Sequence, residues 1–273
     1  MKSPPFSLKG DFLKNNQRVP SGTPKSNNRR IKSLICEERG NDTFHFPQRN
    51  HGAQKAANGL FATLLRMVIM KKIAVFISGG GSNLQSIIDA VESGYLNIQI
   101  SVVLSNDEEA FGLTRAGNHG IPALAVKHGD FESREKFETR LIEILDGYGV
   151  DLVVLAGFMR VLTPLFVNHF HHRIINIHPS ILPSFPGTHS QKQALDYGVR
   201  FSGCTTHFVD EGTDTGPIII QTVVPVLPGD TEESLGSRIL KEEHRIFPES
   251  LKLWSEGRIL IEGRKVVILP DES

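Results

Sequence analysis

From Lys71 onward, β-branched runs alternate with segments whose apolar residues have helical spacing, and this alternation restricts the fold more than any other feature. The run KKIAVFIS (71–78) is almost continuously apolar, as expected for a strand buried on both faces. LQSIIDAVES (84–93) follows with its aliphatic residues on one helical face, and IQISVVLS (98–105) and VDLVVLAG (150–157) repeat the strand pattern. The sequence therefore predicts an α/β fold with a doubly wound, mostly parallel sheet.

Three polar segments follow three of the predicted strands. SGGGSN begins at Ser78, LAGFMR begins at Leu155, and NIHPS begins at Asn176. In a doubly wound sheet, ligands bind outside the carboxyl ends of the strands. We therefore expect these three segments to meet at one edge of the sheet and to form a site there.

The glycine segment ISGGGSNL (77–84) leads from a strand into a helix. Glycines allow close approach of the backbone, and the first turn of a helix offers free N–H groups to an anion. We expect Ser82 or Asn83 to cap this helix. The segment lacks the third glycine of a dinucleotide fingerprint and has no Walker lysine, so it suits the single phosphate of a nucleotide monophosphate. The alternative is a plain tight turn.

The segment NIHPSILPSFPG (176–187) places an amide and an imidazole two residues apart at the end of a predicted strand. At that spacing Asn176 and His178 point to the same side, and the prolines that follow restrict the loop. An amide donor beside an imidazole suits a reaction that passes through an oxyanion, with Asn176 stabilising charge and His178 moving a proton. The alternative is a pair of residues that only satisfy local backbone groups.

The first 70 residues differ in composition from the rest of the chain. Residues 1–72 contain 14 lysines and arginines against four acidic residues, although the whole chain has a formal charge of zero. They are rich in Ser, Asn and Pro and show no periodicity, which predicts a disordered leader. A basic leader poor in acidic residues is typical of a transit peptide, with the plastid (chloroplast) as first destination and the mitochondrion as second. The alternatives are a plain disordered basic arm, or an artefact of the start codon, since Met67 and Met70 lie just before the first predicted strand.

Several classes of protein are disfavoured by composition. The apolar run Leu60–Met70 is interrupted by Arg66 and is too short to cross a membrane. Few aromatic residues accompany the basic ones, so a nucleic-acid-binding arm is disfavoured. With only two cysteines, Cys36 and Cys204, in regions of different composition, the sequence disfavours a disulfide framework, and no Cys/His cluster has the spacing of metal ligands. We expect small-molecule substrates, no metal, no nucleic acid and no membrane; the sequence carries no signal for oligomeric state.

Four segments carry a resemblance to a known family. SGGGSNLQ, LAGFMRVL, NIHPSILPSFPG and DTGPIIIQ, in this order, resemble the phosphoribosylglycinamide formyltransferases over Lys72–Gly257. One departure from the family pattern is Gly80, at a position where bacterial members have a polar residue. The resemblance implies a single Rossmann-like catalytic domain at 71–273 after a leader at 1–70. It also implies transfer of the formyl group of 10-formyltetrahydrofolate to the amine of glycinamide ribonucleotide in de novo purine biosynthesis.

The resemblance also implies roles for particular residues. The implied catalytic set is Asn176, His178 and Asp214. The implied nucleotide-binding set is Gly81, Ser82, Asn83 and Glu243. The implied folate-binding set is Arg134, Met159, Arg160, Val161, Leu162 and Asn176. A carboxylate near an imidazole favours its charged form, so we expect Asp214 to raise the pKa of His178 toward neutral pH.

Other functions remain compatible with the same residues. A formyltetrahydrofolate deformylase shares the Asn, His and Asp set but uses water as the acceptor; residues 1–70 lack the βαβ pattern of its N-terminal regulatory domain. A tRNA formyltransferase would need a further RNA-binding domain after Gly257. A nucleotide-binding module without catalysis would not need His178 and Asp214 together. The transferase is the function that the sequence favours.

Overall fold

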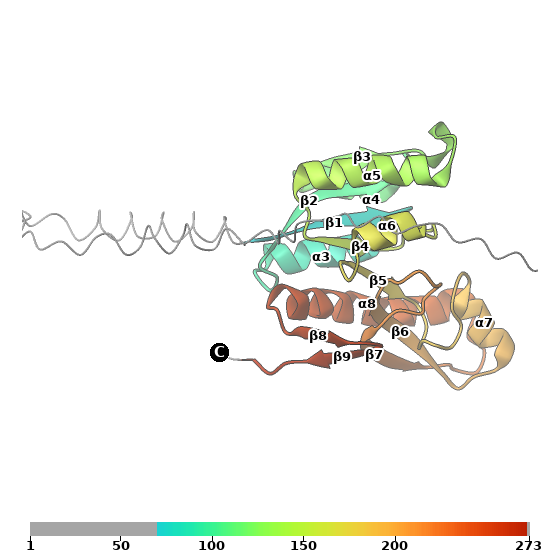
Figure 1. Ribbon diagram of the computed structural model, residues 1–273. Helices are drawn as coiled ribbons and strands as arrows, with labels where there is room; N and C mark the ends of the chain where they lie inside the picture. The colour runs from blue at the N-terminus through green and yellow to red at the C-terminus, as the bar shows by residue number, and fades with distance from the viewer. Residues whose placement is uncertain (1–69, 272–273) are drawn as a thin grey trace, which may run out of the picture. The chain divides into compact units, whose positions relative to one another are not determined.

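The computed structural model describes residues 70–271, so the predicted leader lies outside the described residues except for its last residue (Figure 1). The strands are β1 (Lys71–Ile77), β2 (Ile98–Ser105), β3 (Ala123–Ala125), β4 (Leu152–Leu155), β5 (Ile174–His178), β6 (Phe201–Phe208), β7 (Ile218–Pro225), β8 (Ile259–Glu262) and β9 (Lys265–Ile268). The helices are α3 (Ser82–Glu92), α4 (Phe111–Asn118), the 3₁₀ helix η1 (His128–Asp130), α5 (Arg134–Tyr148), α6 (Pro164–His169), α7 (Ser190–Tyr197) and α8 (Glu232–Ser255).

Seven of these strands form one sheet in the order β3-β2-β1-β4-β5-β6-β7. The first five strands in the chain are parallel to one another, whereas β6 is antiparallel to both β5 and β7. The remaining strands, β8 and β9, form a separate antiparallel hairpin. The predicted α/β fold with a mostly parallel sheet is thus confirmed. Only β6 runs in the opposite direction, and the sheet continues through it to β7.

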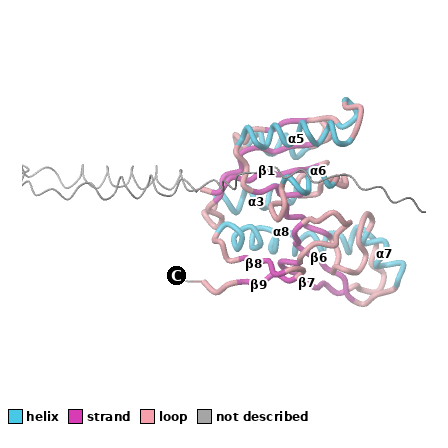
Figure 2. Tube along the Cα trace, in the orientation of Figure 1, coloured by secondary structure: helices cyan, strands magenta, loops and turns pink. Residues whose placement is uncertain are grey.

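Helices cover both faces of the sheet, and each face has its own apolar core (Figures 1 and 2). The alternation of side chains along β1 divides the strand between them: Ile73, Val75 and Ile77 enter one core, and Ala74 and Phe76 enter the other. The first core includes buried residues of α3 and α8, and the second includes those of α5 and α6. A continuous apolar strand is needed because both of its faces are buried.

The order of the strands reverses at β1, which lies between β2 and β4. At such a switch point the loops after the two neighbouring strands diverge and leave a crevice at their carboxyl ends. Ser78, directly after β1, forms hydrogen bonds to the segments that follow β2 and β4. Its backbone N–H donates to Gly157 O at 3.1 Å, and its hydroxyl donates to Asn106 at 2.5 Å and accepts from Met159 N at 2.8 Å.

The long helix α8 closes one face of the sheet. A capping box formed by Thr231 and Ser234 starts it, and its apolar face is buried at Leu235, Ile239 and Phe247. Proline disfavours a helix interior, but α8 runs through Pro248 as one element. Pro248 is itself buried, and packing of this face outweighs the one hydrogen bond that proline cannot donate.

The close contact between β6 and β7 requires glycine at position 203, and this requirement can be tested. A Cβ atom at this position would lie 1.9 Å from the backbone oxygen of Thr222. Because backbone must move to relieve this contact, we expect Gly203→Ala to lower the free energy of unfolding in urea by about 1–3 kcal/mol. The matched control is Gly147→Ala in α5, where a Cβ meets no atom within 4 Å. It should raise stability by up to about 1 kcal/mol, and equal effects of the two changes would contradict this pairing.

Candidate active site

A cavity of about 470 Å³ lies at the carboxyl ends of β4 and β5. Three of its walls come from segments that are distant in sequence: 157–162 after β4, 176–179 at the end of β5, and 210–214 between β6 and β7. The segment 187–191, which leads into α7, closes a further side. Parallel strands bring these segments together because their ends share one edge of the sheet.

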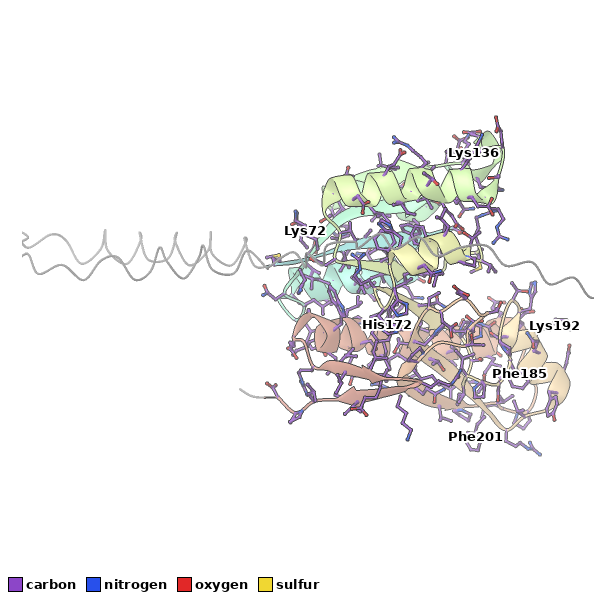
Figure 3. The ribbon with its side chains drawn as sticks, viewed as in Figure 1. Lys72, Lys136, His172, Phe185, Lys192 and Phe201 are labelled. Carbon is purple, nitrogen blue, oxygen red and sulfur yellow. The ribbon has the colours of Figure 1, made fainter. Side chains whose placement is uncertain are left out.

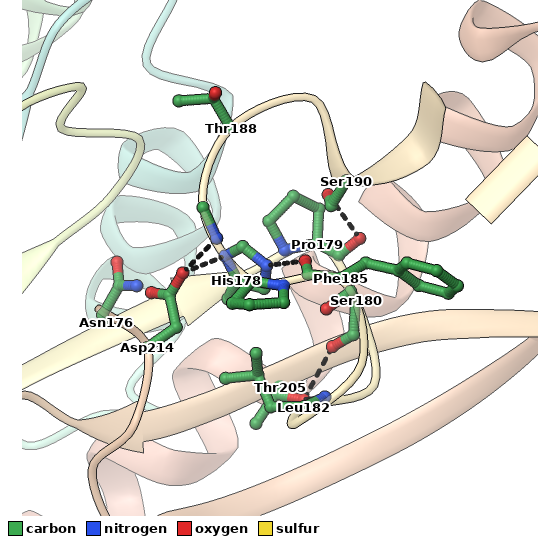
Figure 4. A network of polar contacts seen from close by, with 12 residues as sticks. Asn176, His178, Pro179, Ser180, Leu182, Phe185, Thr188, Ser190, Thr205 and Asp214 are labelled. Carbon is green, nitrogen blue, oxygen red and sulfur yellow. Dashed lines mark hydrogen bonds and ion pairs between the residues drawn. The ribbon is translucent and has the colours of Figure 1, made fainter. Parts of the chain in front are cut away.

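Asn176 and His178 both line this cavity from β5, in agreement with their spacing of two along the strand. His178 is almost fully buried. Its Nε2 lies 2.9 Å from the carbonyl oxygen of Phe185, which can only accept, so Nε2 carries a hydrogen. Its Nδ1 lies 3.3 Å from Oδ2 of Asp214 (Figure 4). Both ring nitrogens therefore face acceptors, and an imidazolium could donate to each.

The loop after β5 is braced by hydroxyl groups as well as by its prolines. Thr205 Oγ1, on the neighbouring strand β6, donates to Ser180 O at 2.7 Å and accepts from Leu182 N at 3.1 Å. Ser190 Oγ donates to Pro179 O at 3.0 Å (Figure 4). These bonds fix the backbone that supplies the Phe185 carbonyl. The orientation of the His178 ring is thereby set by the loop.

The protonation of His178 differs from the expectation. Burial lowers the pKa of His178 below its ordinary value, although the Phe185 carbonyl and the Asp214 carboxylate both act to raise it. The expected direction of the Asp214 contribution is therefore right, but the expected net rise is wrong, because loss of hydration around the ring outweighs it. In the free chain at neutral pH, His178 is a neutral imidazole beside a carboxylate that stabilises any proton it takes up.

Asp214 lies in the connection between β6 and β7, with its backbone in the left-handed region at φ 55°. Its Oδ2 accepts a hydrogen bond from Gly187 N at 2.7 Å. Burial alone would raise the pKa of Asp214, but the neighbouring His207, the hydrogen bond from Gly187 and, at the acidic pH where Asp214 titrates, the charge of protonated His178 hold it below its ordinary value. Asp214 is therefore ionised at neutral pH and directs a negative charge at His178.

A second buried histidine, His207 on β6, belongs to the site and was not singled out from the sequence. Its Nδ1 lies 2.9 Å from Phe208 O and so carries a hydrogen. Its Nε2 lies 3.1 Å from the amide nitrogen of Asn176 and 3.6 Å from Oδ1 of Asp214. A neutral ring accepts from Asn176, whereas a protonated ring faces Asp214. His207 is the strand partner of Asn176, and this register is the signal that sequence spacing does not contain.

The segment predicted to bind folate forms the apolar wall of the cavity. Met159, Arg160, Val161 and Leu162 all line it. Leu162 is buried, but Met159 is 74% exposed and Val161 60% exposed, although both face the cavity. Apolar side chains exposed within a cavity favour an apolar ligand surface. Arg134 is not among the lining residues, and its guanidinium instead donates to the carbonyl oxygen of Val161.

The glycine segment is shaped differently from the expectation at its helix start. Gly81 is the N-cap of α3, in the left-handed conformation at φ 69° and without a side-chain cap. Ser82 and Asn83 lie within the first turn of α3, so the prediction that one of them caps the helix is wrong. The left-handed turn at Gly81 packs closely against Gly112. A Cβ atom added to Gly112 would lie 3.2 Å from the Cα atom of Gly81, so this close approach requires glycine at position 112. The uncapped N–H groups of this turn suit an anion.

Asn83 and Glu243 come together although 160 residues separate them. Asn83 Nδ2 donates to Glu243 Oε2 at 2.7 Å, and both side chains are more than nine-tenths buried. Burial raises the pKa of Glu243, and the bond from Asn83 only partly opposes this. Asn83 Oδ1 is buried without a partner, which suits a hydroxyl donor from a ligand. Gly81, Ser82, Asn83 and Glu243 are not among the residues that line the 470 Å³ cavity.

Three further features concern the described residues, 70–271. No group of three or more His, Cys, Asp or Glu residues there could hold a metal ion. Cys204 is fully buried, and burial raises the pKa of its thiol, as expected for a core residue and not for a nucleophile. Within the same residues, no helix is long and apolar enough to span a membrane.

Comparison with known proteins decides the family. Residues 71–251 match the family model described as formyl transferase. The chain belongs to this family. It is similar to phosphoribosylglycinamide formyltransferase of Escherichia coli, with 45% identity over 187 residues that cover 68% of this chain and 88% of that protein. A crystal structure of glycinamide ribonucleotide transformylase 1 from Symbiobacterium toebii superimposes with a TM-score of 0.73 and 51% identity, covering 74% of this chain and 95% of that one.

A further relative is much longer. The trifunctional purine biosynthetic protein adenosine-3 of Drosophila melanogaster is 52% identical over 193 residues, which cover 70% of this chain. The match spans only 14% of that protein's length. The similarity therefore concerns one part of the trifunctional protein.

The contribution of Asp214 to the pKa of His178 can be measured directly. Because the carboxylate stabilises the imidazolium, we expect Asp214→Asn to lower the pKa of His178 further below its wild-type value. An NMR titration of the imidazole C–H signals gives both values, and the signal missing from His178→Gln assigns the ring. An equal or higher pKa in Asp214→Asn would contradict the charge interaction inferred from the 3.3 Å approach.

Proposed function

We propose that this chain transfers the formyl group of 10-formyltetrahydrofolate to the amine of glycinamide ribonucleotide, a step of purine biosynthesis. The observation that carries the proposal is the convergence of Asn176, His178 and Asp214 on one cavity that is also lined by the apolar residues Met159, Val161 and Leu162. The relatives named phosphoribosylglycinamide formyltransferase, which this chain matches over most of their length, support the same acceptor.

The arrangement suits attack of an amine on a formyl group. The amine nitrogen bonds to the formyl carbon, whose oxygen becomes an oxyanion, and the bond from that carbon to N10 then breaks. One proton leaves the amine and one reaches N10, so the reaction needs no net proton uptake. Asn176 donates its amide hydrogen to the oxyanion. His178, neutral at rest, accepts a proton and holds it beside Asp214, which stabilises the imidazolium.

The two ligands occupy different surfaces in this proposal. Met159 and Val161 contact the folate ring from the apolar wall. The first turn of α3 after Gly81 binds the phosphate of the ribonucleotide through its N–H groups. Asn83 and Glu243 bind the ribose, since Asn83 Oδ1 offers a buried acceptor and Glu243 a carboxyl group beside it.

Asn176, His178 and Asp214 form the polar wall of the cavity, and removing the amide of Asn176 tests its role. We expect Asn176→Ala to lower kcat by about 10²–10³-fold with smaller changes in KM, because the oxyanion exists only in the transition state.

His178→Ala and Asp214→Asn should each lower kcat, and the double variant should be little worse than the worse single one, because the two residues act as a unit. The exposed His171→Ala is the control and should retain wild-type kcat. Fully multiplicative losses would separate Asp214 from His178.

The acceptor is identified by measuring release of tetrahydrofolate with and without glycinamide ribonucleotide. A transferase releases tetrahydrofolate only when the ribonucleotide is present, whereas a deformylase releases it together with formate when water is the only acceptor. Binding of both ligands with no release of tetrahydrofolate would support a non-catalytic binding module. Either of the last two outcomes would replace the proposed function.

We also propose that residues 1–70 direct the chain to an organelle, first the plastid and second the mitochondrion. The support is their composition, with 14 basic and four acidic residues up to residue 72. A fluorescent reporter fused to residues 1–70 should enter one of these organelles in plant cells. The same reporter with Arg29, Arg30 and Lys32 changed to glutamine is the control and should enter less efficiently. A diffuse signal from the unchanged fusion would reject both destinations.

A further inference from the structure

We propose that Glu138, on α5, is a positioning residue that holds the folate-facing segment Met159–Thr163 in place. The inference rests on the proposed function for its ligand, but its structural part concerns only this chain. Glu138 does not line the cavity, and the sequence offers no pattern that distinguishes it from the other acidic residues of α5.

The contacts of Glu138 are unusual for a glutamate on a helix. Its side chain is 2% exposed, and one oxygen accepts from the backbone N–H of Thr163 at 2.8 Å. The other oxygen accepts from the hydroxyl of Thr163. A buried carboxylate is tolerated only when donors satisfy it, and Thr163 supplies both of these donors. Thr163 lies directly after the folate-facing residues and is the N-cap of α6, with no side-chain cap of its own.

Neighbouring residues on the same face of α5 bind the same segment. Arg134, four residues before Glu138, donates to the carbonyl oxygen of Val161. The ring of Phe137 lies 5.8 Å from the guanidinium carbon of Arg160. Residues at this spacing share one side of a helix, so α5 presents an anchor to each of three residues along the segment. Arg134 and Phe137 contact the middle of the segment, at Val161 and Arg160, and Glu138 holds its last residue, Thr163.

The opposite end of the segment is held from the sheet. Ser78 accepts from Met159 N at 2.8 Å and donates its own N–H to Gly157 O at 3.1 Å. Between these anchors, Met159 and Val161 extend into the cavity and remain largely exposed, so packing within the protein does not set their positions. Their placement follows from the backbone, and the backbone is held at one end by Ser78 and at the other by Glu138.

Loss of Glu138 should therefore loosen the apolar wall and leave the polar wall unchanged. In Glu138→Leu the N–H of Thr163 is left buried without an acceptor, and we expect KM for 10-formyltetrahydrofolate to rise by about tenfold. KM for glycinamide ribonucleotide should change little, because the α3 turn and Glu243 lie outside this contact. In Glu138→Gln the amide can accept from the N–H and donate to the hydroxyl, so KM should stay within about threefold of wild type.

A control and a second variant separate positioning from stability. Lys136 lies two residues before Glu138 on α5. Its side chain is at the surface of the molecule (Figure 3), where it pairs with Glu132. Lys136→Gln should leave both KM values unchanged. If Glu138→Leu does not fold, Thr163→Val removes only the hydroxyl bond and should raise the folate KM by a smaller factor. In folded variants, hydrogen exchange of the peptide spanning 157–163 should accelerate in Glu138→Leu and not in Lys136→Gln.

The outcomes distinguish this inference from the proposed function. If the wild type fails to use glycinamide ribonucleotide, the function is wrong, but the exchange measurement still tests the anchor. If the wild type is active and Glu138→Leu lowers the melting temperature without changing folate KM or exchange at 157–163, Glu138 is only structural. An equal rise in both KM values would also overturn the inference, because a general distortion would then explain it.

Discussion

Parallel pairing of β1, β4 and β5 is the constraint on which the site depends. Because these strands run in the same direction, Ser78, Gly157 and Asn176 all emerge at the same edge of the sheet. The cavity lies at the ends of β4 and β5, and the hydrogen bonds of Ser78 join the end of β1 to Gly157 and Met159 after β4. A fold with the same helices and an antiparallel arrangement would place these segments at opposite edges. The apolar continuity of the strands is thus also a requirement of function.

A balance between burial and hydrogen bonding governs the polar wall. Asp214 remains ionised although its side chain is largely buried, because Gly187 and the two histidines face its oxygens. Its charge then partly offsets the loss of hydration at His178, whose pKa still falls below the ordinary value. Such an imidazole is neutral before reaction and gains a stabilising partner when it takes up a proton. Asp214 therefore acts most strongly on the charged form, which is the form that appears during proton transfer.

The sequence predicts the parts of this molecule that follow from local patterns. Strand and helix periodicity predicts the α/β sheet, and the spacing of Asn176 and His178 predicts that they share a side. Features that depend on pairing between distant segments cannot be predicted from local sequence patterns. His207 joins the site through the register of β5 against β6, and the pKa of His178 depends on burial by residues from several elements. Gly81 caps α3 because its left-handed turn fits against Gly112, a contact with another helix.

The two walls of the cavity reach precision by different means. On the polar wall, His178 and Asp214 are nearly buried, so packing and hydrogen bonds fix their atoms directly. On the apolar wall, Met159 and Val161 remain exposed until a ligand covers them, and their side chains contribute little to their own placement. An exposed apolar wall can bind a flat ring only if its backbone is already ordered, because ordering it on binding would weaken affinity. Anchors behind the wall, on α5 and at Ser78, meet this requirement without occupying the space that the ligand needs.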